Sequence, residues 1–378
     1  MAEPILVAAA WASGAVAFLI DRERVQFEGN IQSLGLLKSD YALAALAEKL
    51  APAERADFAH AIAAGAIDLR VRLVGDKGAV RYLRFIGRRE GDGPLTGLVL
   101  PAGLFSLDAR DQLNRENRVA AAVEDGEILA HYQPIVSLET GELAGFEALA
   151  RWDRPGVGLI GPDDFIPLAD DLDLLGKIGA QVRRTAANDL SAWKAAAPEA
   201  PLFIAANATV SELLSDGFAA ALIDAVGQAD LRAGSYKLEI AETEIMKQPE
   251  AAEKVMAELK AAGITLALDD FGTGYSSLSR LDEFSFDTVK IDRYFVRAMA
   301  SSPSATKVVE SVLQLARHFG MTVVAEGIED EETARLLADM GCDYGQGFRF
   351  AGALAPQLAS EIVKSGLTGR IRPPAGQA

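Results

Sequence analysis

From residue 130 onward, short apolar runs alternate with longer stretches of helical periodicity, and this alternation limits the possible folds more than any other feature of the sequence. Helical patterns occupy, for example, residues 176–195, 251–262, 305–319 and 331–340. The apolar runs cover residues 131–138, 143–149, 202–207, 236–240, 264–268, 288–291, 322–325 and 345–350. About eight strand–helix units in roughly 250 residues predict an α/β fold, a (β/α)8 barrel of the TIM type.

The first two apolar runs are separated only by Glu139-Thr140-Gly141-Glu142. Parallel strands need a crossover of about a dozen residues or more, whereas a short link is enough for a hairpin. We therefore expect one strand of the barrel to run antiparallel, which departs from a regular barrel.

Most of the apolar runs end in a residue that carries a side-chain oxygen. These strand-end residues are Glu147, Asn207, Glu239, Asp269, Asp270 and Glu326. Because strand ends meet at one mouth of a barrel, the carboxylates there would repel each other and be costly to desolvate. Each acid alone is more simply interpreted as a salt-bridge partner or a surface residue. So many acids after apolar runs favour a shared site for two divalent cations.

The composition limits which metal such a site can hold. One cysteine and three histidines exclude a cysteine-based zinc site and a multi-histidine cage. Oxygen ligands favour Mg²⁺ or Mn²⁺, and the adjacent Asp269 and Asp270 suit bridging between two ions. Ions about 3.5–4 Å apart would generate a hydroxide and stabilise an in-line displacement at phosphorus. Lys290, in the sixth run, would orient the water or balance charge.

The charge distribution divides the chain near residue 105. The first 105 residues carry 12 acidic and 12 basic side chains, so the net charge of −17 lies entirely in the remainder. We expect a first domain over residues 1–105, a connecting helix over 106–125 and a second domain over 126–370. An acidic chain repels phosphate backbones and anionic lipids, so we expect no nucleic-acid polymer as a partner.

The first segment has the pattern of a small α+β domain. It contains strand-like runs at 17–20 and 25–27, helical patterns at 41–50 and 53–64, and hairpin-linked strands at 67–73, 80–86 and 95–100. Phe18-Leu19-Ile20-Asp21, Asp76-Lys77-Gly78 and Gly97-Leu98-Val99-Leu100 make the segment resemble a PAS domain, which implies a sensory role. The segment has no cysteine for flavin–thiol chemistry, and His60 fits a surface or core residue better than a haem ligand.

Residues 106–125 are charged, with a thin apolar stripe of Leu107, Leu113, Val119 and Val123. The stripe favours a helix that transmits rotation or pairs with its twin in a homodimer, and the alternative is a solvated linker. Residues 5–20 are uncharged but too short for a membrane span, and they lack the basic flank of a signal peptide. We expect a buried helix that runs into a strand there, no membrane span, and a soluble cytoplasmic protein.

Seven short motifs occur in order along residues 115–365. They are Tyr132-Gln133-Pro134-Ile135-Val136, Glu147-Ala148-Leu149 extended to Arg151-Trp152, Glu239-Ile240-Ala241-Glu242, Asp269-Asp270-Phe271-Gly272-Thr273-Gly274-Tyr275-Ser276-Ser277, Val289-Lys290-Ile291-Asp292, Ala325-Glu326-Gly327-Ile328-Glu329 and Gln346-Gly347-Phe348. Together they resemble the EAL domain, the family of cyclic di-GMP phosphodiesterases. The resemblance implies hydrolysis of one phosphodiester bond of cyclic di-GMP to linear pGpG, and we expect the first domain to regulate this activity.

The resemblance also implies a role for each matching position. Metal ligands would be Glu147, Asn207, Glu239 and Asp269 for one ion, and Asp269, Asp270 and Glu326 for the other. Residues assigned to catalysis are Lys290, which would contact the attacking water, Glu326, and Glu242, which would brace the loop at residues 270–275. Positions that would line the substrate are Gln133, Leu149, Arg151, Asp292 and Gln346, with Arg151 on a phosphate.

The sequence departs from the family pattern at Ala241, where threonine is usual, and at Phe348, where tyrosine is common. No Gly-Gly-Asp-Glu-Phe string occurs, so synthesis of cyclic di-GMP is excluded. One alternative function is a non-catalytic or weakly active receptor that binds cyclic di-GMP and signals through protein contacts. A glycosidase with paired carboxylates is another, but it explains neither Asp269-Asp270 nor Lys290.

Overall fold

The computed structural model of the chain describes residues 15–102, 107–245, 248–271 and 284–365. These residues divide into two compact units. The first contains residues up to Ile128 together with Trp152–Lys177. The second contains Leu129–Arg151 together with residues from Ile178 onward.

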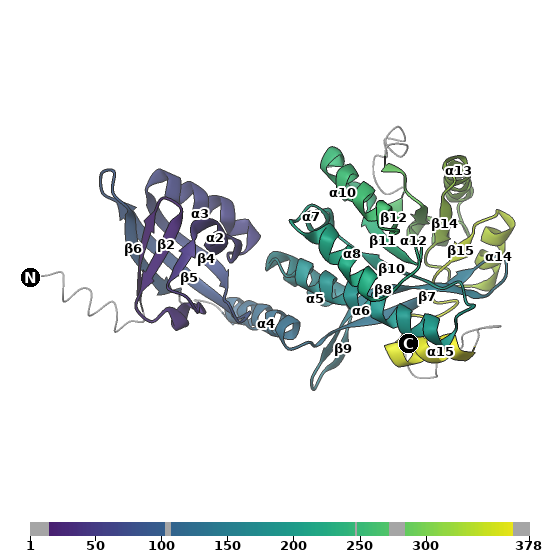
Figure 1. The fold of residues 1–378 in the computed structure, drawn as a ribbon, viewed down its shortest axis with the longest axis horizontal. Coiled ribbons are helices and arrows are strands. Elements are labelled where there is room, and N and C mark those ends of the chain that lie inside the picture. Colours follow the sequence, from purple (N-terminus) through teal and green to yellow (C-terminus); the bar gives the residue numbers. More distant parts are fainter. Residues whose placement is uncertain (1–14, 103–106, 246–247, 272–283, 366–378) are drawn as a thin grey trace, which may run out of the picture. The chain divides into compact units, whose positions relative to one another are not determined.

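The first unit is built on a six-stranded antiparallel sheet in the order β3-β2-β1-β6-β5-β4. Its strands are β1 (Val16–Asp21), β2 (Arg24–Glu28), β3 (Asp40–Ala42), β4 (Ala66–Val74), β5 (Val80–Arg89) and β6 (Leu95–Pro101). A 3₁₀ turn, η1 (Ile31–Leu34), and the helices α2 (Leu43–Glu48) and α3 (Pro52–Ala64) lie between β2 and β4. The helices cover one face of the sheet, so the predicted α+β arrangement is confirmed (Figure 1).

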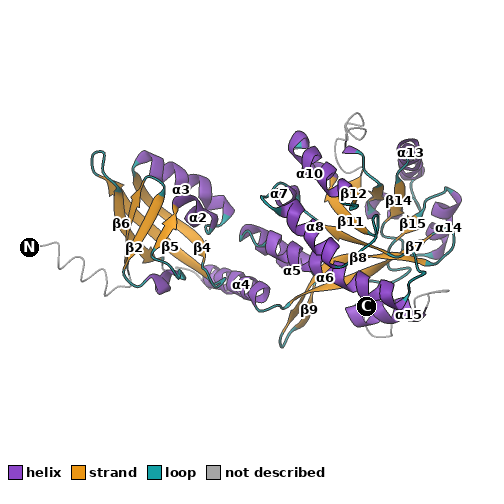
Figure 2. Cartoon of the chain, viewed as in Figure 1, coloured by secondary structure: helices purple, strands orange, loops and turns teal. Residues whose placement is uncertain are grey.

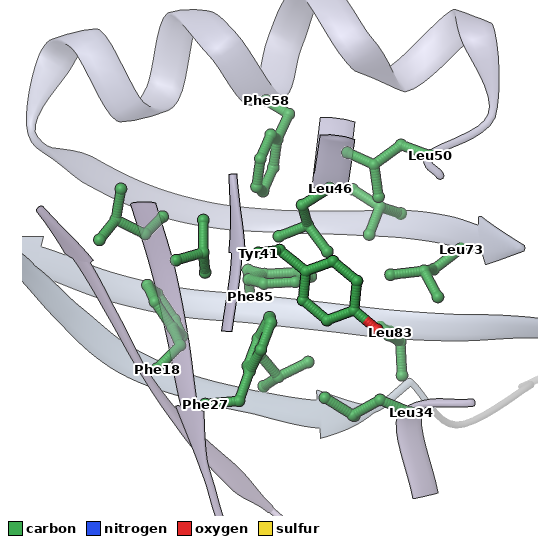
Figure 3. Packing of buried hydrophobic residues seen from close by; sticks show 14 of the residues in the cluster. Phe18, Phe27, Leu34, Tyr41, Leu46, Leu50, Phe58, Leu73, Leu83 and Phe85 are labelled. Carbon is green, nitrogen blue, oxygen red and sulfur yellow. The ribbon is translucent and has the colours of Figure 1, made fainter. Parts of the chain in front are cut away.

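The core of this unit lies between α3 and the sheet. Alternate residues of the strands are buried, so one face of each strand is apolar. Figure 3 shows Phe58 of α3 pointing down to Phe85 of β5, with ring centroids 5.3 Å apart at 76°. Phe18 of β1 approaches Phe85 from another side, at 5.5 Å. Each buried ring of this kind contributes about 1.5–3 kcal/mol.

The helix α4 (Leu107–Glu124) packs against the opposite face of this sheet. Its fully buried Glu116 forms an ion pair with Arg72 of β4, with 3.1 Å between Glu116 Oε1 and Arg72 Nη1. The side-chain oxygen of Asn117 accepts a hydrogen bond from the backbone nitrogen of Val80 at 2.8 Å. The segment expected at 106–125 is therefore a helix over Leu107–Glu124 that packs on the sheet at Glu116 and Asn117, rather than a solvated linker. The same unit includes β9 (Gly158–Ile160) and α5 (Pro162–Asp171).

The second unit is a closed eight-stranded barrel surrounded by helices (Figure 2). The barrel strands are β7 (Ile128–Ser137), β8 (Leu143–Arg154), β10 (Phe203–Asn207), β11 (Tyr236–Ala241), β12 (Thr265–Phe271), β13 (Thr288–Ile291), β14 (Thr322–Ala325) and β15 (Tyr344–Gly345). Pairing of β8 with β10 closes the barrel, and β7 runs antiparallel to β15. The predicted barrel with one antiparallel strand is confirmed.

Helices of the barrel follow the strands in sequence. They are α6 (Leu175–Ala196), α7 (Val210–Leu213), α8 (Phe218–Gln228), α9 (Glu242–Ile245), α10 (Pro249–Ala261), α12 (Arg293–Ala298), α13 (Pro303–Phe319), α14 (Glu331–Asp339) and α15 (Pro356–Ser365). Among the described helices, none is both long and apolar enough to cross a lipid bilayer.

Three predicted elements differ in the structure. The predicted strand at 345–350 is wrong after Gly345, because Phe350 and Ala351 donate to the carbonyl of Gly347 and close a turn there. The predicted helix at 41–50 begins only at Leu43, because Tyr41 pairs with β2. The second barrel strand does not end at 149 but continues to Arg154, where it pairs with β9. Residues 5–14 of the predicted N-terminal helix lie outside the described residues.

Candidate active site

The centre of the candidate site is the amine of Lys290, which lies among four carboxylates at the mouth of the barrel. Its Nζ is 2.6 Å from Glu326 Oε1 and 2.8 Å from Glu239 Oε2. Asp269 Oδ1 and Glu147 Oε2 lie at 3.3 and 3.4 Å. Lys290 is only 1% exposed. The five side chains come from five strands of the barrel or their ends, and four carboxylates around one amine leave an excess of negative charge.

Strand geometry explains how β8 contributes to this mouth. Successive side chains of a strand point to opposite sides, so Glu147, Leu149 and Arg151 share one side, and all three line the cavity. Two residues before Glu147, Gly145 lies against β10, where an added Cβ would come within 2.3 Å of the carbonyl oxygen of Phe203. Glycine at this position therefore permits the strand pairing that closes the barrel.

Asp269 and Asp270 are adjacent in β12, yet both line the cavity. In a regular strand the two side chains would point to opposite sides. The pairing of β12 with β13 shifts register between Leu268 and Phe271, and Asp270 has a φ of 56°. Aspartate tolerates this left-handed conformation better than most residues. The irregularity thus turns both carboxylates toward the same space.

Side-chain amides hold Glu147 in place. Asn207 Nδ2 donates to Glu147 Oε1 at 2.9 Å, and Gln346 Nε2 donates to Glu147 Oε2 at 2.6 Å. Gln346 Nε2 also lies 2.9 Å from Gln133 Oε1. Burial alone would raise the pKa of Glu147, but the charge of Lys290 and these amide donors lower it. Glu147 therefore stays ionised.

Glu326 and Glu239 have pKa values above those of ordinary carboxyl groups. Burial, reinforced by the charges of Asp269 and Glu147 and only partly offset by Lys290, raises the pKa of Glu326 to about 7. Burial and the charge of Glu147 raise the pKa of Glu239 well above its ordinary value. These shifts share one cause, because a single buried ammonium cannot offset several buried carboxylates.

A cavity of about 420 Å³ opens beside these groups. Its lining consists of Gln133, Glu147, Leu149, Arg151, Asn207, Asp269, Asp270, Lys290, Asp292, Arg293, Arg297, Glu326, Gly327, Gln346, Gly347, Phe348 and Ala353. All the predicted site residues are in this set except Glu239 and Glu242. Glu239 lies behind it, in contact with Lys290. Glu242 is buried at the start of α9, and residues 272–275 of the loop it is expected to brace lie outside the described residues.

The lining residues that sequence reasoning did not assign include Arg293, Arg297 and Phe348. Arg293 and Arg297 lie on α12, one helical turn apart, and Arg297 forms an ion pair with Glu329. Phe348 is 70% exposed although it is a large aromatic residue. The position of Arg293 directly after Asp292 was the available signal, since a helix that begins at a strand end points its first residues toward the mouth.

The donor set suits a hard divalent cation in its chemistry. Carboxylate and amide oxygens are the ligands that Mg²⁺ and Mn²⁺ prefer. The buried Gln346 Oε1 has no hydrogen-bond partner, and a buried acceptor of this kind needs a donor or a cation. Across the described part of the chain, however, no group of three or more His, Cys, Asp and Glu side chains is spaced to hold a metal ion. The carboxylate oxygens are arranged around the amine of Lys290, which occupies the position on which they converge.

The geometry and the order of the motifs agree with one family. A family model for the EAL domain matches residues 116–353, more than half of the chain. The chain belongs to the EAL domain family.

Relatives of this EAL domain occur in several bacteria. A protein of Mycobacterium tuberculosis without an assigned function is 37% identical over 259 residues, which cover 68% of this chain and 41% of the relative. A cyclic di-GMP phosphodiesterase of Pseudomonas aeruginosa is 35% identical over 245 residues, which cover 65% of this chain and 41% of that protein. The chain thus spans less than half the length of the curated relatives it matches.

Solved structures show the same barrel. The PaMucR phosphodiesterase in complex with c-di-GMP has a TM-score of 0.62 at 32% identity, over 65% of this chain and 99% of that one. The EAL domain of Mycobacterium smegmatis DcpA has a TM-score of 0.56 at 32% identity, over 65% and 100%. The EAL enzyme Bd1971 bound to cAMP and cyclic di-GMP has a TM-score of 0.64 over 93% of both chains, and at 22% identity this likeness concerns the fold alone.

Proposed function

We propose that this EAL domain hydrolyses one phosphodiester bond of cyclic di-GMP and releases linear pGpG, with two divalent cations, Mg²⁺ or Mn²⁺, bound at the barrel mouth. The observation that carries the proposal is the convergence of Glu147, Glu239, Asp269 and Glu326 on Lys290. The phosphodiesterase relative and the solved c-di-GMP complex support the substrate class.

Side-chain oxygens of the mouth would hold the cations. The proposed ligands are Glu147, Asn207, Glu239, Asp269, Asp270 and Glu326. Bound cations would supply a water of lowered pKa and would neutralise charge that develops on the phosphate. Excess negative charge among buried carboxylates supports this assignment, because it favours any cation that can enter.

The chain's own residues would bind and orient the substrate. Lys290 keeps a positive charge beside the acids and would orient the attacking water by donating a hydrogen bond. Arg151, Arg293 and Arg297 line the same cavity, and guanidinium groups bind phosphate oxygens with two parallel hydrogen bonds. The exposed ring of Phe348 offers a surface on which a base can stack.

We also propose that residues 1–105 form a PAS-like regulatory domain, that residues 106–125 connect it and that residues 126–370 form the phosphodiesterase. The antiparallel sheet with helices on one face supports the first assignment, and the packing of α4 on the other face supports the second. Val119 and Val123 of the expected dimer stripe are already buried within the single chain. A homodimer would therefore use another surface.

A turnover assay tests the proposed function. Full-length protein is incubated with cyclic di-GMP and Mg²⁺ or Mn²⁺, and pGpG is quantified by chromatography. We expect turnover by the wild type and a loss of about 100-fold or more in Glu147→Ala and in Asp269→Asn at saturating metal. A matched control is Asp68→Asn, which removes an exposed acid paired with Arg84 on the first unit.

The outcomes separate the alternatives. Tight binding of cyclic di-GMP without turnover would select the receptor function, and absence of both would refute the proposal. Unchanged activity in Glu147→Ala or Asp269→Asn would refute the assignment of the cation ligands. Circular dichroism of each variant checks that the fold persists.

A further inference from the structure

A buried ion pair lies directly behind the end of β10. Arg183 on α6 is 4% exposed, and its Nη2 lies 2.8 Å from Glu212 Oε1. Its Nη1 donates to the backbone oxygen of Asn207 at 2.9 Å. Burying a guanidinium is costly unless its donors are used, so a buried pair of this kind adds little to stability by itself. Its contact with a residue of the candidate site indicates a different role.

The helix α6 is shaped to admit this pair. Gly179 lies one turn before Arg183, inside the helix, where glycine is unfavourable. A Cβ added at Gly179 would come within 2.4 Å of Glu212 Oε1 and 2.6 Å of Arg183 Nη1. The side-chain space that a larger residue would fill is taken up by the ion pair.

Glu212 holds the other side of the same turn. Its Oε2 accepts hydrogen bonds from the backbone nitrogen of Thr209 at 3.0 Å and from the Thr209 hydroxyl at 3.1 Å. The hydroxyl in turn accepts from the Glu212 backbone nitrogen at 3.1 Å, which completes a capping box at the start of α7. Arg183 and Glu212 thus fix the chain at Asn207 and again at Thr209, two residues later.

Asn207 itself is exposed at the strand end and depends on this support. Its Nδ2 donates to Glu147 Oε1 at 2.9 Å, so its amide oxygen is the atom it can offer to a cation. The direction of that oxygen follows from the position of the Asn207 backbone. The neighbouring Ala208 nitrogen is tied to the Glu239 carbonyl at 2.9 Å, and Arg183 holds the Asn207 carbonyl.

We propose that Arg183, supported by Glu212, is a positioning residue that sets the orientation of Asn207 as a cation ligand. The inference rests on the proposed function, in which Asn207 holds one of the cations. Arg183 does not line the cavity, so its effect passes through the backbone of Asn207. Partners behind metal ligands typically change metal affinity or activity by about 10–100-fold when they are removed.

The test must separate positioning from folding. Arg183→Met alone leaves the mostly buried Glu212 carboxylate without its ion-pair partner and destabilises the chain. The double variant Arg183→Met/Glu212→Gln removes that charge, and glutamine at this position keeps the capping box. Glu212→Gln alone keeps the bond from Arg183 to the Asn207 carbonyl. A matched control is Arg317→Met, which removes another guanidinium that donates to backbone carbonyls, those of Met340 and Gly341.

Binding of Mn²⁺ alone to the full-length chain, measured by electron paramagnetic resonance of the free ion, is the first readout. We expect the double variant to melt close to the wild-type temperature, to bind Mn²⁺ about 10-fold or more weakly, and to lose kcat at limiting metal with KM little changed. Glu212→Gln and Arg317→Met should bind Mn²⁺ nearly as the wild type does.

Equal Mn²⁺ affinity in the wild type and the double variant, or no Mn²⁺ binding to the wild type, would overturn the inference. A loss of affinity that is matched by Arg317→Met would also overturn it. A wild type that binds Mn²⁺ but releases no pGpG would refute the proposed function and leave the positioning role of Arg183 standing.

Discussion

At the scale of single residues, the amine of Lys290 faces four carboxylates within 3.4 Å while it is 1% exposed. In the absence of bound cations, the ammonium of Lys290 offsets part of the free-energy cost of burying these carboxylates. Burial alone would lower its pKa, but Asp269, Glu147 and the other acids raise the pKa well above the ordinary value. Lys290 therefore has a structural task in the cation-free protein in addition to its proposed task in catalysis.

Replacing Lys290 by methionine should expose this structural task. In the presence of a chelator we expect Lys290→Met to lower the free energy of unfolding by about 3–5 kcal/mol, because several buried charges lose their partner. Added Mg²⁺ should recover more stability in the variant than in the wild type. The measurement is chemical denaturation with and without Mg²⁺.

The control for this substitution is Lys260→Met. Lys260 pairs with Asp287, and both side chains are 32% exposed, so the change should cost no more than about 1 kcal/mol. Equal stability of Lys290→Met and the wild type in chelator would contradict the assigned role of the ammonium.

The raised pKa of Glu326, about 7, predicts how cation binding depends on pH. The folded protein keeps this proton up to about pH 7, whereas the unfolded chain loses it near pH 4.3. Between these values the folded state binds more protons, so the cation-free protein loses stability as the pH rises.

A cation that binds Glu326 must displace this proton, and we expect Mn²⁺ affinity to fall about fivefold from pH 7 to pH 6. Calorimetry in two buffers of different ionisation enthalpy should detect the released proton. A Mn²⁺ affinity that does not change with pH, measured without proton release, would contradict the role assigned to Glu326.

At the scale of elements, Asp76 in the turn between β4 and β5 contacts three other segments of the first unit. Asp76 accepts hydrogen bonds from the backbone nitrogen of Leu37 at 2.7 Å and from the hydroxyl of Tyr41 at 2.6 Å. Its other oxygen lies 2.6 Å from Lys49 Nζ. Partial burial alone would raise the pKa of Asp76, but the hydrogen bonds from Lys49 and Tyr41 lower it to about 2.

Asp76→Asn should therefore destabilise the first unit by about 1–2 kcal/mol at neutral pH. The folded carboxyl stays ionised down to about pH 2, whereas the unfolded one gains its proton near pH 3.9. The stabilisation is complete above pH 4 and is lost as the pH falls toward 2. Thermal melting at several pH values measures the difference. Asp92→Asn, in an exposed turn, is the control, and equal losses in both variants would show that the contacts of Asp76 contribute nothing.

The sequence predicted most elements because apolar periodicity and strand-end acids are local signals. It could not predict the end of β15, because Gly347 adopts a φ of 153° and lies against the backbone of Ile328, a tertiary contact that leaves no trace in the local periodicity. It also could not predict that a shift of register turns Asp269 and Asp270 to the same side. The site residues were predicted from motifs, whereas Arg293 and Arg297 became visible only when α12 was placed at the mouth.

At the scale of the whole molecule, α4 packs on the sheet of the first unit and precedes β7, the first strand of the barrel, in the sequence. Its Glu116 and Asn117 are held by Arg72 and Val80 of that sheet, and β7 follows directly after it. The two-domain organisation was suggested by the balance of charge in the sequence, but the contacts of α4 required the structure.

Removal of residues 1–105 should change kcat or the oligomeric mass, because α4 loses the surface that buries Glu116. The measurements are steady-state kinetics and light scattering on full-length and truncated protein, with a melting curve to show that the barrel is folded. Identical kinetics and oligomeric mass in the two proteins would show that the first unit affects neither turnover nor assembly.

The account depends most on acids from separate strands sharing divalent cations beside Lys290, and anomalous scattering from crystals soaked in Mn²⁺ tests this directly. We expect two anomalous peaks about 3.5–4 Å apart, within bonding distance of oxygens from Glu147, Asn207, Glu239, Asp269, Asp270 and Glu326. A mouth without peaks, in which the carboxylates still contact Lys290 Nζ, would contradict it.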